Sequence, residues 1–190
     1  EINIRKVCVM AKVSIIGTGT WGIALGMVLA QNGHEVTAWS ALPKEIEALK
    51  ESYKCKNLPG VEIPRSIVFT ADLQEACTDK EMLVLSVPSV FTRGVAKQMN
   101  PFVKEGQLIV SVAKGIEEKT LMTMSQQIEE ELPMANVAVL SGPSHAEEVS
   151  RGIPTTVVVG AKDRQTAEHI QNLFMSSVFR VYTSPDILGI

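Results

Sequence analysis

The chain has 190 residues, of which 45% are hydrophobic and 21% charged, and its formal net charge is −3. This composition is typical of one to one and a half globular domains with enough apolar material for a core. Because only 5% of the residues are aromatic and the cations form no basic block, nucleic acid is a poor match as a partner. No apolar run approaches the ~20 residues of a membrane helix, and the first residues do not resemble a signal peptide. We therefore expect a cytoplasmic protein without membrane insertion.

Apolar runs alternate with segments of helical periodicity along most of the chain. In chain order we expect a strand at 13–16, a helix at 21–31, a strand at 35–39, a helix at 43–51, a strand at 67–70, a helix capped by Asp72 and ending at Cys77, a strand at 82–87, a helix at 90–99, a strand at 108–112, a helix at 119–131, a strand at 136–140, a helix at 146–150, a strand at 155–159, a helix at 164–174 and a strand at 179–182. The strands are continuously apolar, as expected when helices cover both faces of a sheet. The sequence therefore predicts an α/β fold with a Rossmann-like, doubly wound, mostly parallel sheet.

Both ends of the chain suggest domain boundaries. Met10 can be the natural start, so we expect residues 1–11 to be an N-terminal extension or remnant. The last residues, "SPDILGI", look like the opening of a helix, because Pro185 and Asp186 are typical helix-start residues. We expect the α/β domain to span 12–184, and residues 185–190 to begin a further domain that is missing from this chain.

The three cysteines, Cys8, Cys55 and Cys77, are scattered and form no C-x-x-C pair. Their spacing predicts neither a metal site nor a disulfide framework. Reduced cytosolic thiols are the simplest interpretation.

The glycine motif Gly17-x-Gly19-x-x-Gly22 follows a predicted strand and opens a predicted helix, which is the context of a dinucleotide site. Gly17 allows the tight turn, Gly19 lets a pyrophosphate approach the backbone, and Gly22 lets the helix pack on the strand. Free N–H groups at the helix start then favour the phosphates. A glycine turn without a ligand is the alternative interpretation.

The end of the second strand usually carries an acidic residue that binds the adenine ribose. Residues 38–42 contain no Asp or Glu, and no Arg that would pair with a 2′-phosphate. Ser40 can hydrogen-bond either cofactor, and Lys44 is the nearest cation, although a lysine there is more often a solvated charge on a helix. The choice between NAD and NADP is left open.

Two further segments follow predicted strands, where ligands of open parallel sheets bind. In "SVPSVF", Pro88 stops the strand, and Ser89 and Phe91 are expected to face the cofactor, although core packing is the ordinary role of such a phenylalanine. In "SVAKGIE", Lys114 lies between an apolar strand and a glycine, so its ammonium can reach the cleft.

The segment "SGPSHAEEV" follows the sixth strand. Gly142 frees backbone N–H groups, and Ser144 is placed to cap the next helix. His145 is the histidine near this set, but its neighbours Glu147 and Glu148 suggest a helix surface. Together, the glycine loop, the lysine and the Gly/Ser helix start predict a site for a dinucleotide and a small anionic substrate.

"GTGTWG", "VPSVF", "AKGIE" and "SGPSHAEEV", in this order, resemble the bacterial NAD(P)-dependent sn-glycerol-3-phosphate dehydrogenases, and the resemblance extends from about Met10 onward. It implies an NAD(P)-binding Rossmann-like domain at 12–184, and an all-helical substrate domain that begins at 185–190. The implied reaction is the reversible reduction of dihydroxyacetone phosphate to sn-glycerol 3-phosphate, which feeds glycerophospholipid synthesis. A homodimer of the full-length protein is also implied.

Site residues follow from the motifs and from this resemblance. The predicted cofactor contacts are Gly17, Gly19, Thr20, Trp21, Gly22, Ser40, Ala41, Pro88, Phe91, Lys114 and Ala146. The predicted substrate contacts are Lys114, Gly142 and Ser144. Trp21 can offer its backbone N–H to the pyrophosphate while its ring covers the cleft. Members of the family often carry Arg or His where this chain has Ala41, which again leaves the cofactor preference open.

The family's catalytic lysine lies in a "GGALKN"-like segment just beyond "DILGI". The resemblance therefore implies that this chain contains no catalytic residue, and that it binds NAD(P)H but turns over negligibly. Two alternatives stay open. Another hydroxyacid dehydrogenase, or a ketopantoate-reductase-like enzyme, would need different strand-end motifs. An NAD(H)-sensing Rossmann module without catalysis could keep the glycine loop, although Lys114 speaks against it.

Overall fold

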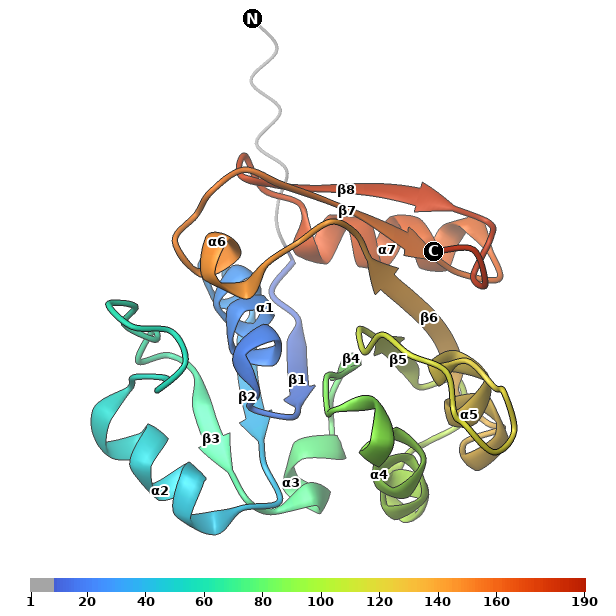
Figure 1. Cartoon of the computed structure of the whole chain (residues 1–190), viewed down its shortest axis with the longest axis horizontal. Helices are drawn as coiled ribbons and strands as arrows, with labels where there is room; N and C mark the ends of the chain where they lie inside the picture. The colour runs from blue at the N-terminus through green and yellow to red at the C-terminus, as the bar shows by residue number, and fades with distance from the viewer. Residues whose placement is uncertain (1–8) are drawn as a thin grey trace, which may run out of the picture.

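A single sheet of eight strands forms the centre of the molecule, in a computed structural model that describes residues 9–190 (Figure 1). The strands are β1 (Lys12–Ile16), β2 (Glu35–Trp39), β3 (Val68–Thr70), β4 (Met82–Leu85), β5 (Leu108–Ser111), β6 (Asn136–Ser141), β7 (Thr155–Gly160) and β8 (Phe179–Ser184). The helices are α1 (Thr20–Gln31), α2 (Pro43–Ser52), α3 (Leu73–Cys77), α4 (Thr92–Met99), α5 (Met124–Glu131), α6 (Ala146–Ser150) and α7 (Arg164–Phe174), with short 3-10 helices η1 (Ser89–Phe91) and η2 (Asn100–Phe102).

The sheet is doubly wound and mostly parallel, as predicted. Its strand order is β3-β2-β1-β4-β5-β6-β7-β8. The first six strands of this order run parallel, β7 is antiparallel to β6, and β8 is parallel to β7. In Figure 1, β3 and α2 lie at one end of the sheet and β8 at the other.

Helices cover both faces of the central strands, which explains why β4 and β5 are buried along their whole length, whereas β8 at the edge alternates buried and exposed residues. In β1, Val13 and Ile15 belong to a buried cluster with α1, α6 and α7, whereas Ile16 belongs to a second cluster with α3, α4 and α5. Every side chain of β4 and β5 is buried. A fully buried aliphatic side chain stabilises the fold by about 1.5–3 kcal/mol relative to an exposed one.

The helix expected at 119–131 begins only at Met124, so its predicted start is wrong. Thr123 and Gln126 form a capping box, in which the Thr123 hydroxyl accepts from the Gln126 N–H at 3.4 Å and the Gln126 side chain accepts from the Thr123 N–H at 2.8 Å. Leu121 has a φ of +59°, which ends any helix before it. The connection from β5 to α5 is therefore a loop, and it carries Lys114.

The segment 185–190 forms no helix, so the helix expected to open there is not observed. The Asp186 carboxylate accepts from the backbone N–H groups of Leu188 and Gly189 at 3.0 and 2.9 Å, as an N-cap residue does. The expected second domain stays a prediction, and residues 1–8, including Cys8, lie outside the described part of the chain.

Cys77 is buried and Cys55 half-buried, and neither forms a disulfide. Burial raises the pKa of the Cys77 thiol to about 12, so this thiol is protonated at neutral pH and a poor nucleophile. Within residues 9–190, no three His, Cys, Asp or Glu side chains gather closely enough to hold a metal ion. No helix in this range has the length and apolar character required to cross a bilayer.

Candidate functional site

The candidate site lies at the carboxyl edge of the parallel strands, where β1 and β4 are neighbours although they are not consecutive. The chain proceeds from β1 toward β2 on one side and from β4 toward β5 on the other, so this is the topological switch point of the sheet. In open parallel sheets, ligands bind in the crevice outside the strand ends at such a point. The glycine loop between β1 and α1 occupies it.

Two of the three motif glycines are required by packing within the protein. Gly17 has a φ of +118°, and a Cβ on it would lie 2.9 Å from the backbone of Ser86. A Cβ on Gly22 would overlap the Gly17 carbonyl oxygen and the Ser86 hydroxyl. That hydroxyl donates to the Gly17 carbonyl at 2.8 Å, and the Gly17 N–H donates to the Trp39 carbonyl at 2.9 Å. These contacts fix the loop against the ends of β2 and β4.

Gly19 has no such packing reason to be glycine. Its φ of −61° is accessible to any residue, and a Cβ on it would meet no protein atom within 4 Å. A side chain here would instead project into the open space beside the loop. The residue therefore meets the requirement of a ligand that must approach the backbone closely, as a pyrophosphate does.

The first turn of α1 offers amide groups to a ligand. Its N-cap, Gly19, has no side chain to accept from them, and the turn contains no acidic residue. The first backbone bond of the helix runs from the Ile23 N–H to the Gly19 carbonyl at 2.9 Å, which leaves the amides of Thr20 and Trp21 ahead of the intrahelical ladder. Together with the dipole of this 12-residue helix, these amides favour an anion.

A cleft of about 440 Å³ opens in front of these amides. Four segments of the chain line it: Gly19, Thr20 and Trp21; Ser86, Val87, Pro88 and Ser89; Val112, Ala113 and Lys114; and Ser144, His145 and Ala146. The predicted contacts among them are Gly19, Thr20, Trp21, Pro88, Lys114, Ser144 and Ala146. The structure therefore brings the predicted strand-end segments to one place.

Lys114 contributes a positive charge to the cleft. Its ammonium donates to the Gly142 carbonyl at 2.9 Å, which leaves two of its three N–H donors for another acceptor. The Ser144 hydroxyl also donates to this carbonyl, at 3.4 Å. His145 is the N-cap of α6, so the expectation that Ser144 caps this helix is wrong. The Ser144 hydroxyl instead faces the same carbonyl as Lys114.

Gly142 lies just after β6. A side chain at this position would collide with β7. A Cβ on it would lie 2.8 Å from the carbonyl oxygen of Thr156 and 3.0 Å from the Cα of Val157, both on β7. Its carbonyl holds Lys114 and Ser144, but Gly142 does not line the cleft. Close packing on β7 is a reason for this glycine that the sequence did not suggest.

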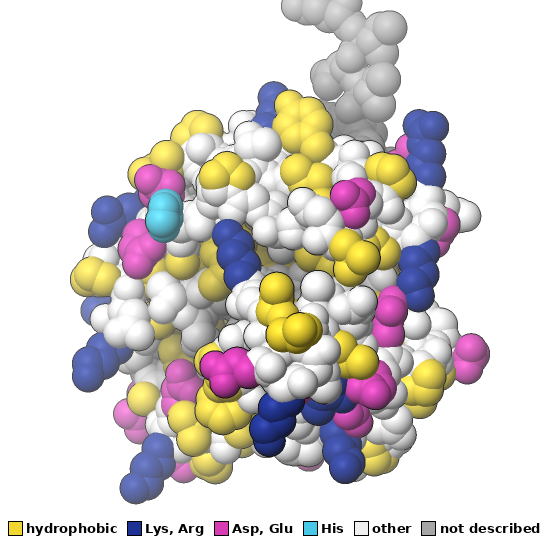
Figure 2. Space-filling model, turned by 45° about the vertical axis from the view of Figure 1, so that its right-hand side comes forward, with side chains coloured by type: hydrophobic (Ala, Val, Ile, Leu, Met, Phe, Trp, Pro, Cys, Tyr) yellow, Lys and Arg dark blue, Asp and Glu magenta, His cyan; other side chains and the backbone are white. Residues whose placement is uncertain are grey.

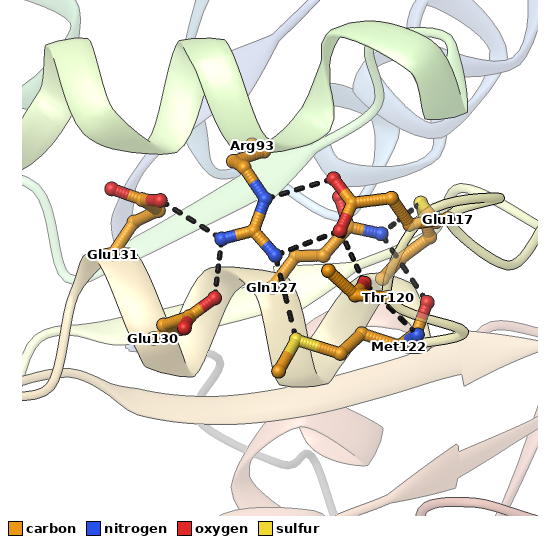
Figure 3. A network of polar contacts seen from close by, with 8 residues as sticks. Arg93, Glu117, Thr120, Met122, Gln127, Glu130 and Glu131 are labelled. Carbon is orange, nitrogen blue, oxygen red and sulfur yellow. Dashed lines mark hydrogen bonds and ion pairs between the residues drawn. The ribbon is translucent and has the colours of Figure 1, made fainter.

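The loop that carries Lys114 is held in place by Arg93 of α4 (Figure 3). The Arg93 guanidinium donates to both carboxylate oxygens of Glu117, at 2.8 and 2.9 Å, and also to Glu130 and Glu131 of α5. The hydrogen bonds from Arg93 lower the pKa of the Glu117 carboxyl from 4.5 to about 2. This network holds Glu117, three residues after Lys114, against α4 and α5.

Some predicted cofactor contacts do not line the cleft. Phe91 is 58% exposed on η1, because the 3-10 turn that follows Pro88 leads the chain away from the cleft after Ser89. Ser40, at the end of β2, is buried, and its hydroxyl donates to Glu45 at 2.6 Å. Ala41 is exposed beside it. Gly17 and Gly22 do not line the cleft, because they pack against each other and against Ser86.

Ser86 is a site residue that the sequence motifs did not predict. It lines the cleft, and its hydroxyl fixes the glycine loop. A serine directly after a buried strand is the available signal. Which strand lies next to β1 is a tertiary fact, however, and chain spacing does not reveal it.

One face of the molecule carries charged side chains of both signs. On the face seen in Figure 2, Lys and Arg side chains are interspersed with Asp and Glu. Charges mixed in this way create no large field of one sign.

The parallel sheet, the switch point and the glycine loop define the class: a dinucleotide-binding domain of the Rossmann type. Residues 12–167 match the family model described as NAD-dependent glycerol-3-phosphate dehydrogenase N-terminus. The chain belongs to this family.

Relatives agree with this assignment. The chain is 61% identical over 181 residues to glycerol-3-phosphate dehydrogenase [NAD(P)+] of Agathobacter rectalis, which covers 95% of this chain and 54% of the relative. It is 52% identical over 184 residues to the protein of the same name from Fusobacterium nucleatum, covering 95% and 55%. The crystal structure of glycerol-3-phosphate dehydrogenase from Coxiella burnetii superposes with a TM-score of 0.88 at 27% identity, over 95% of this chain and 55% of that one. The chain therefore spans about half the length of the relatives it matches.

Proposed function

We propose that this chain is the N-terminal, cofactor-binding part of an NAD(P)-dependent glycerol-3-phosphate dehydrogenase that interconverts dihydroxyacetone phosphate and sn-glycerol 3-phosphate. One observation carries the proposal: Gly19 is open to the cleft without a packing reason, and it lines the same cleft as Lys114 at the switch point. Membership of the family supports the proposal.

The residues present fit a dinucleotide and a small phosphorylated substrate. The α1 amides hold the pyrophosphate, and the Trp21 ring, which also packs against the core, forms a wall of the cleft. The nicotinamide, when bound, supplies hydride chemistry. The two remaining donors of Lys114 orient the substrate and stabilise negative charge on it. Ser144 lies beside Lys114 as a further polar contact.

The remaining parts of the proposal concern the whole enzyme. The group that donates a proton to the carbonyl oxygen of dihydroxyacetone phosphate is a lysine beyond Ile190, so these 190 residues hold cofactor but do not catalyse appreciably. The enzyme acts in the cytoplasm as a homodimer, and its product serves glycerophospholipid synthesis.

The test is equilibrium binding of NADH and NADPH to the 190-residue chain, followed by energy transfer from its tryptophans to the nicotinamide. We expect saturable binding to the chain, and in the full-length enzyme we expect dihydroxyacetone phosphate to tighten this binding through Lys114. Lys114→Met should abolish the tightening, whereas Lys97→Met, which removes an exposed lysine of α4, should leave it unchanged.

Three outcomes would count against the proposal. A chain that binds neither nucleotide at millimolar concentration is not a cofactor domain. In the full-length enzyme, NAD(H) binding that dihydroxyacetone phosphate never affects favours the NAD(H)-sensing alternative. Appreciable reduction of dihydroxyacetone phosphate by the 190 residues alone contradicts a proton donor beyond Ile190.

A further inference from the structure

Residues 38–42, at the end of β2, contain no acidic side chain, but a carboxylate from the next helix reaches this place. Glu45, in the first turn of α2, reaches back to Ser40, whose hydroxyl donates to Glu45 Oε2 at 2.6 Å. The Ser40 hydroxyl also accepts from the Leu42 N–H at 3.2 Å. Its single proton is therefore committed to Glu45, and the hydroxyl is not free to donate to a ligand.

This carboxylate lies on the side of the glycine loop where the adenosine half of a dinucleotide is bound in such folds. The Trp39 carbonyl, one residue before Ser40, accepts from the Gly17 N–H at 2.9 Å, so the loop and the end of β2 are in direct contact. Glu45 is half-buried, and its second oxygen, Oε1, has no hydrogen bond or ion pair to any described residue. That oxygen remains available to accept from a ribose hydroxyl.

We infer that Glu45 is the residue that sets the cofactor preference, and that it favours NAD over NADP. The inference rests on the proposed function, because it concerns the same cofactor site. A ribose 2′-hydroxyl can donate to the Glu45 carboxylate, whereas a 2′-phosphate has no proton to offer and is repelled by a like charge. Ser40 acts through Glu45, as the group that holds its carboxylate at the strand end.

Lys44, the neighbouring cation, does not reverse this balance. It is exposed on α2 and makes no ion pair within the described residues, so its charge is solvated and mobile. The Glu45 charge is fixed by a short hydrogen bond to a buried hydroxyl. A fixed charge at the strand end acts on the ribose more strongly than one that water screens.

The neighbouring strand contains a matched pair that serves as an internal control. At the end of β3, the Thr70 hydroxyl donates to Glu75 Oε2 at 2.5 Å and accepts from the Asp72 N–H at 3.0 Å. The spacing of five residues and the position in the first turn of a helix are the same as for Ser40 and Glu45. β3 is the edge strand, however, and it is separated from β1 by β2. The two pairs share a local structure but differ in their distance from the glycine loop.

The experiment measures the dissociation constants of NADH and NADPH for the parent chain, Glu45→Gln, Glu75→Gln and Glu47→Gln. In Glu45→Gln the new amide oxygen still accepts from Ser40, so the fold is retained while the charge is removed. We expect the parent to prefer NADH, and we expect Glu45→Gln to tighten NADPH binding by roughly tenfold through loss of like-charge repulsion. Glu75→Gln and Glu47→Gln, which remove the same charge elsewhere, should leave the NADPH/NADH ratio within about twofold. Thermal unfolding confirms that each variant folds.

Ser40→Ala supplies a second test that keeps the charge. It releases the Glu45 carboxylate from its hydrogen bond, so we expect discrimination against NADPH to weaken by a smaller factor than in Glu45→Gln. The inference is overturned if the parent prefers NADPH, if Glu45→Gln leaves the ratio unchanged, or if all three glutamate variants change it equally. A parent that binds NADH with an unchanged ratio in Glu45→Gln refutes this inference alone. A parent that binds neither nucleotide refutes the proposed function as well.

Discussion

The two edges of the same sheet differ in what their backbone leaves unpaired. At the carboxyl edge, the cleft of about 440 Å³ faces uncapped helix amides and a glycine with no packing contact. At the amino edge, a larger cavity of about 650 Å³ lies between the starts of β4, β5 and β6 and the helix α7. The larger cavity is not where the chemistry converges.

At the amino edge, polar groups of the protein are hydrogen-bonded to one another. The Gln107 side chain donates to the carbonyls of Lys80 and Glu81 at 3.2 and 3.3 Å, and the Asn136 side chain donates to Thr166 at 2.9 Å. Cavity volume is therefore a poor guide to the binding site in this molecule. Unpaired backbone donors, and space that a missing side chain keeps free, are better guides.

Gly22→Ala should have the largest effect, because its Cβ would overlap the Gly17 carbonyl and the Ser86 hydroxyl. We expect a loss of about 3 kcal/mol or more in the free energy of unfolding, seen as a melting temperature lower by roughly 6–12 °C. Loss of NADH binding should accompany it. An unchanged melting temperature would show that the glycine loop is not packed against β4 as described.

Gly19→Ala adds the same methyl group three residues earlier, at the N-cap of α1, where the protein leaves it room. We expect the free energy of unfolding to change by less than about 1 kcal/mol. The affinity for NADH should fall by roughly tenfold to a hundredfold, because overlap of one methyl with the ligand costs about 1–3 kcal/mol. Unchanged affinity would mean that the ligand does not approach Gly19, and the contrast between the two edges would be lost.

Arg93→Gln tests the network behind Lys114. Without the guanidinium, the pKa of Glu117 should rise from about 2 toward 4.5, which an NMR titration of its carboxyl carbon measures. A depressed pKa in the folded state contributes stability that is present above pH 4.5 and lost as the pH falls toward 2. The variant loop should therefore no longer show acid-dependent loosening in this range, and NADH affinity should fall by a few-fold.

Arg164→Gln is the matched control for Arg93→Gln, because it breaks an exposed ion pair with Glu168 on α7. It should leave both the Glu117 titration and NADH binding unchanged. If the Glu117 pKa stays near 2 in Arg93→Gln, the guanidinium is not its cause.

His169→Gln should have the smallest effect, and it addresses the amino edge. His169 pairs with Glu81 at 2.7 Å, and both side chains are nearly half exposed, so the pair contributes at most about 1 kcal/mol to stability. We expect an unchanged affinity for NADH and a melting temperature within about 4 °C of the parent. A marked loss of NADH binding would show that the larger cavity takes part in the site.

The elements were predictable where hydrophobic runs are continuous, as in β4 and β5, because burial on both faces demands them. The start of α5 was not, since the Thr123 capping box and the positive φ of Leu121 outweigh the helical pattern before them. The local motif around Gly17, Gly19 and Gly22 was readable from spacing. Only the structure separates the two glycines that serve packing from the one that leaves room for a ligand.

The polar pairings of the site were beyond sequence reasoning for a different reason. Ser86 reaches Gly17 across 69 positions, and Lys114 reaches Gly142 across 28. Such pairs depend on which strands become neighbours. Ser40 and Glu45 are only five positions apart, but the side-chain contact needs the turn from β2 into α2 to fold Glu45 back.

The junction between β6 and β7 joins the last two strands to the rest of the sheet by only three residue pairs, Val139 with Gly160, Leu140 with Val159 and Ser141 with Val158. β7 and β8 pair over six residues, so they form the longer ladder. We expect the β7–α7–β8 unit to exchange its amide protons as one cooperative group, opening at this junction before the parallel strands do. Lys114 binds the Gly142 carbonyl next to the junction, so a ligand that draws the ammonium away would couple site occupancy to local unfolding.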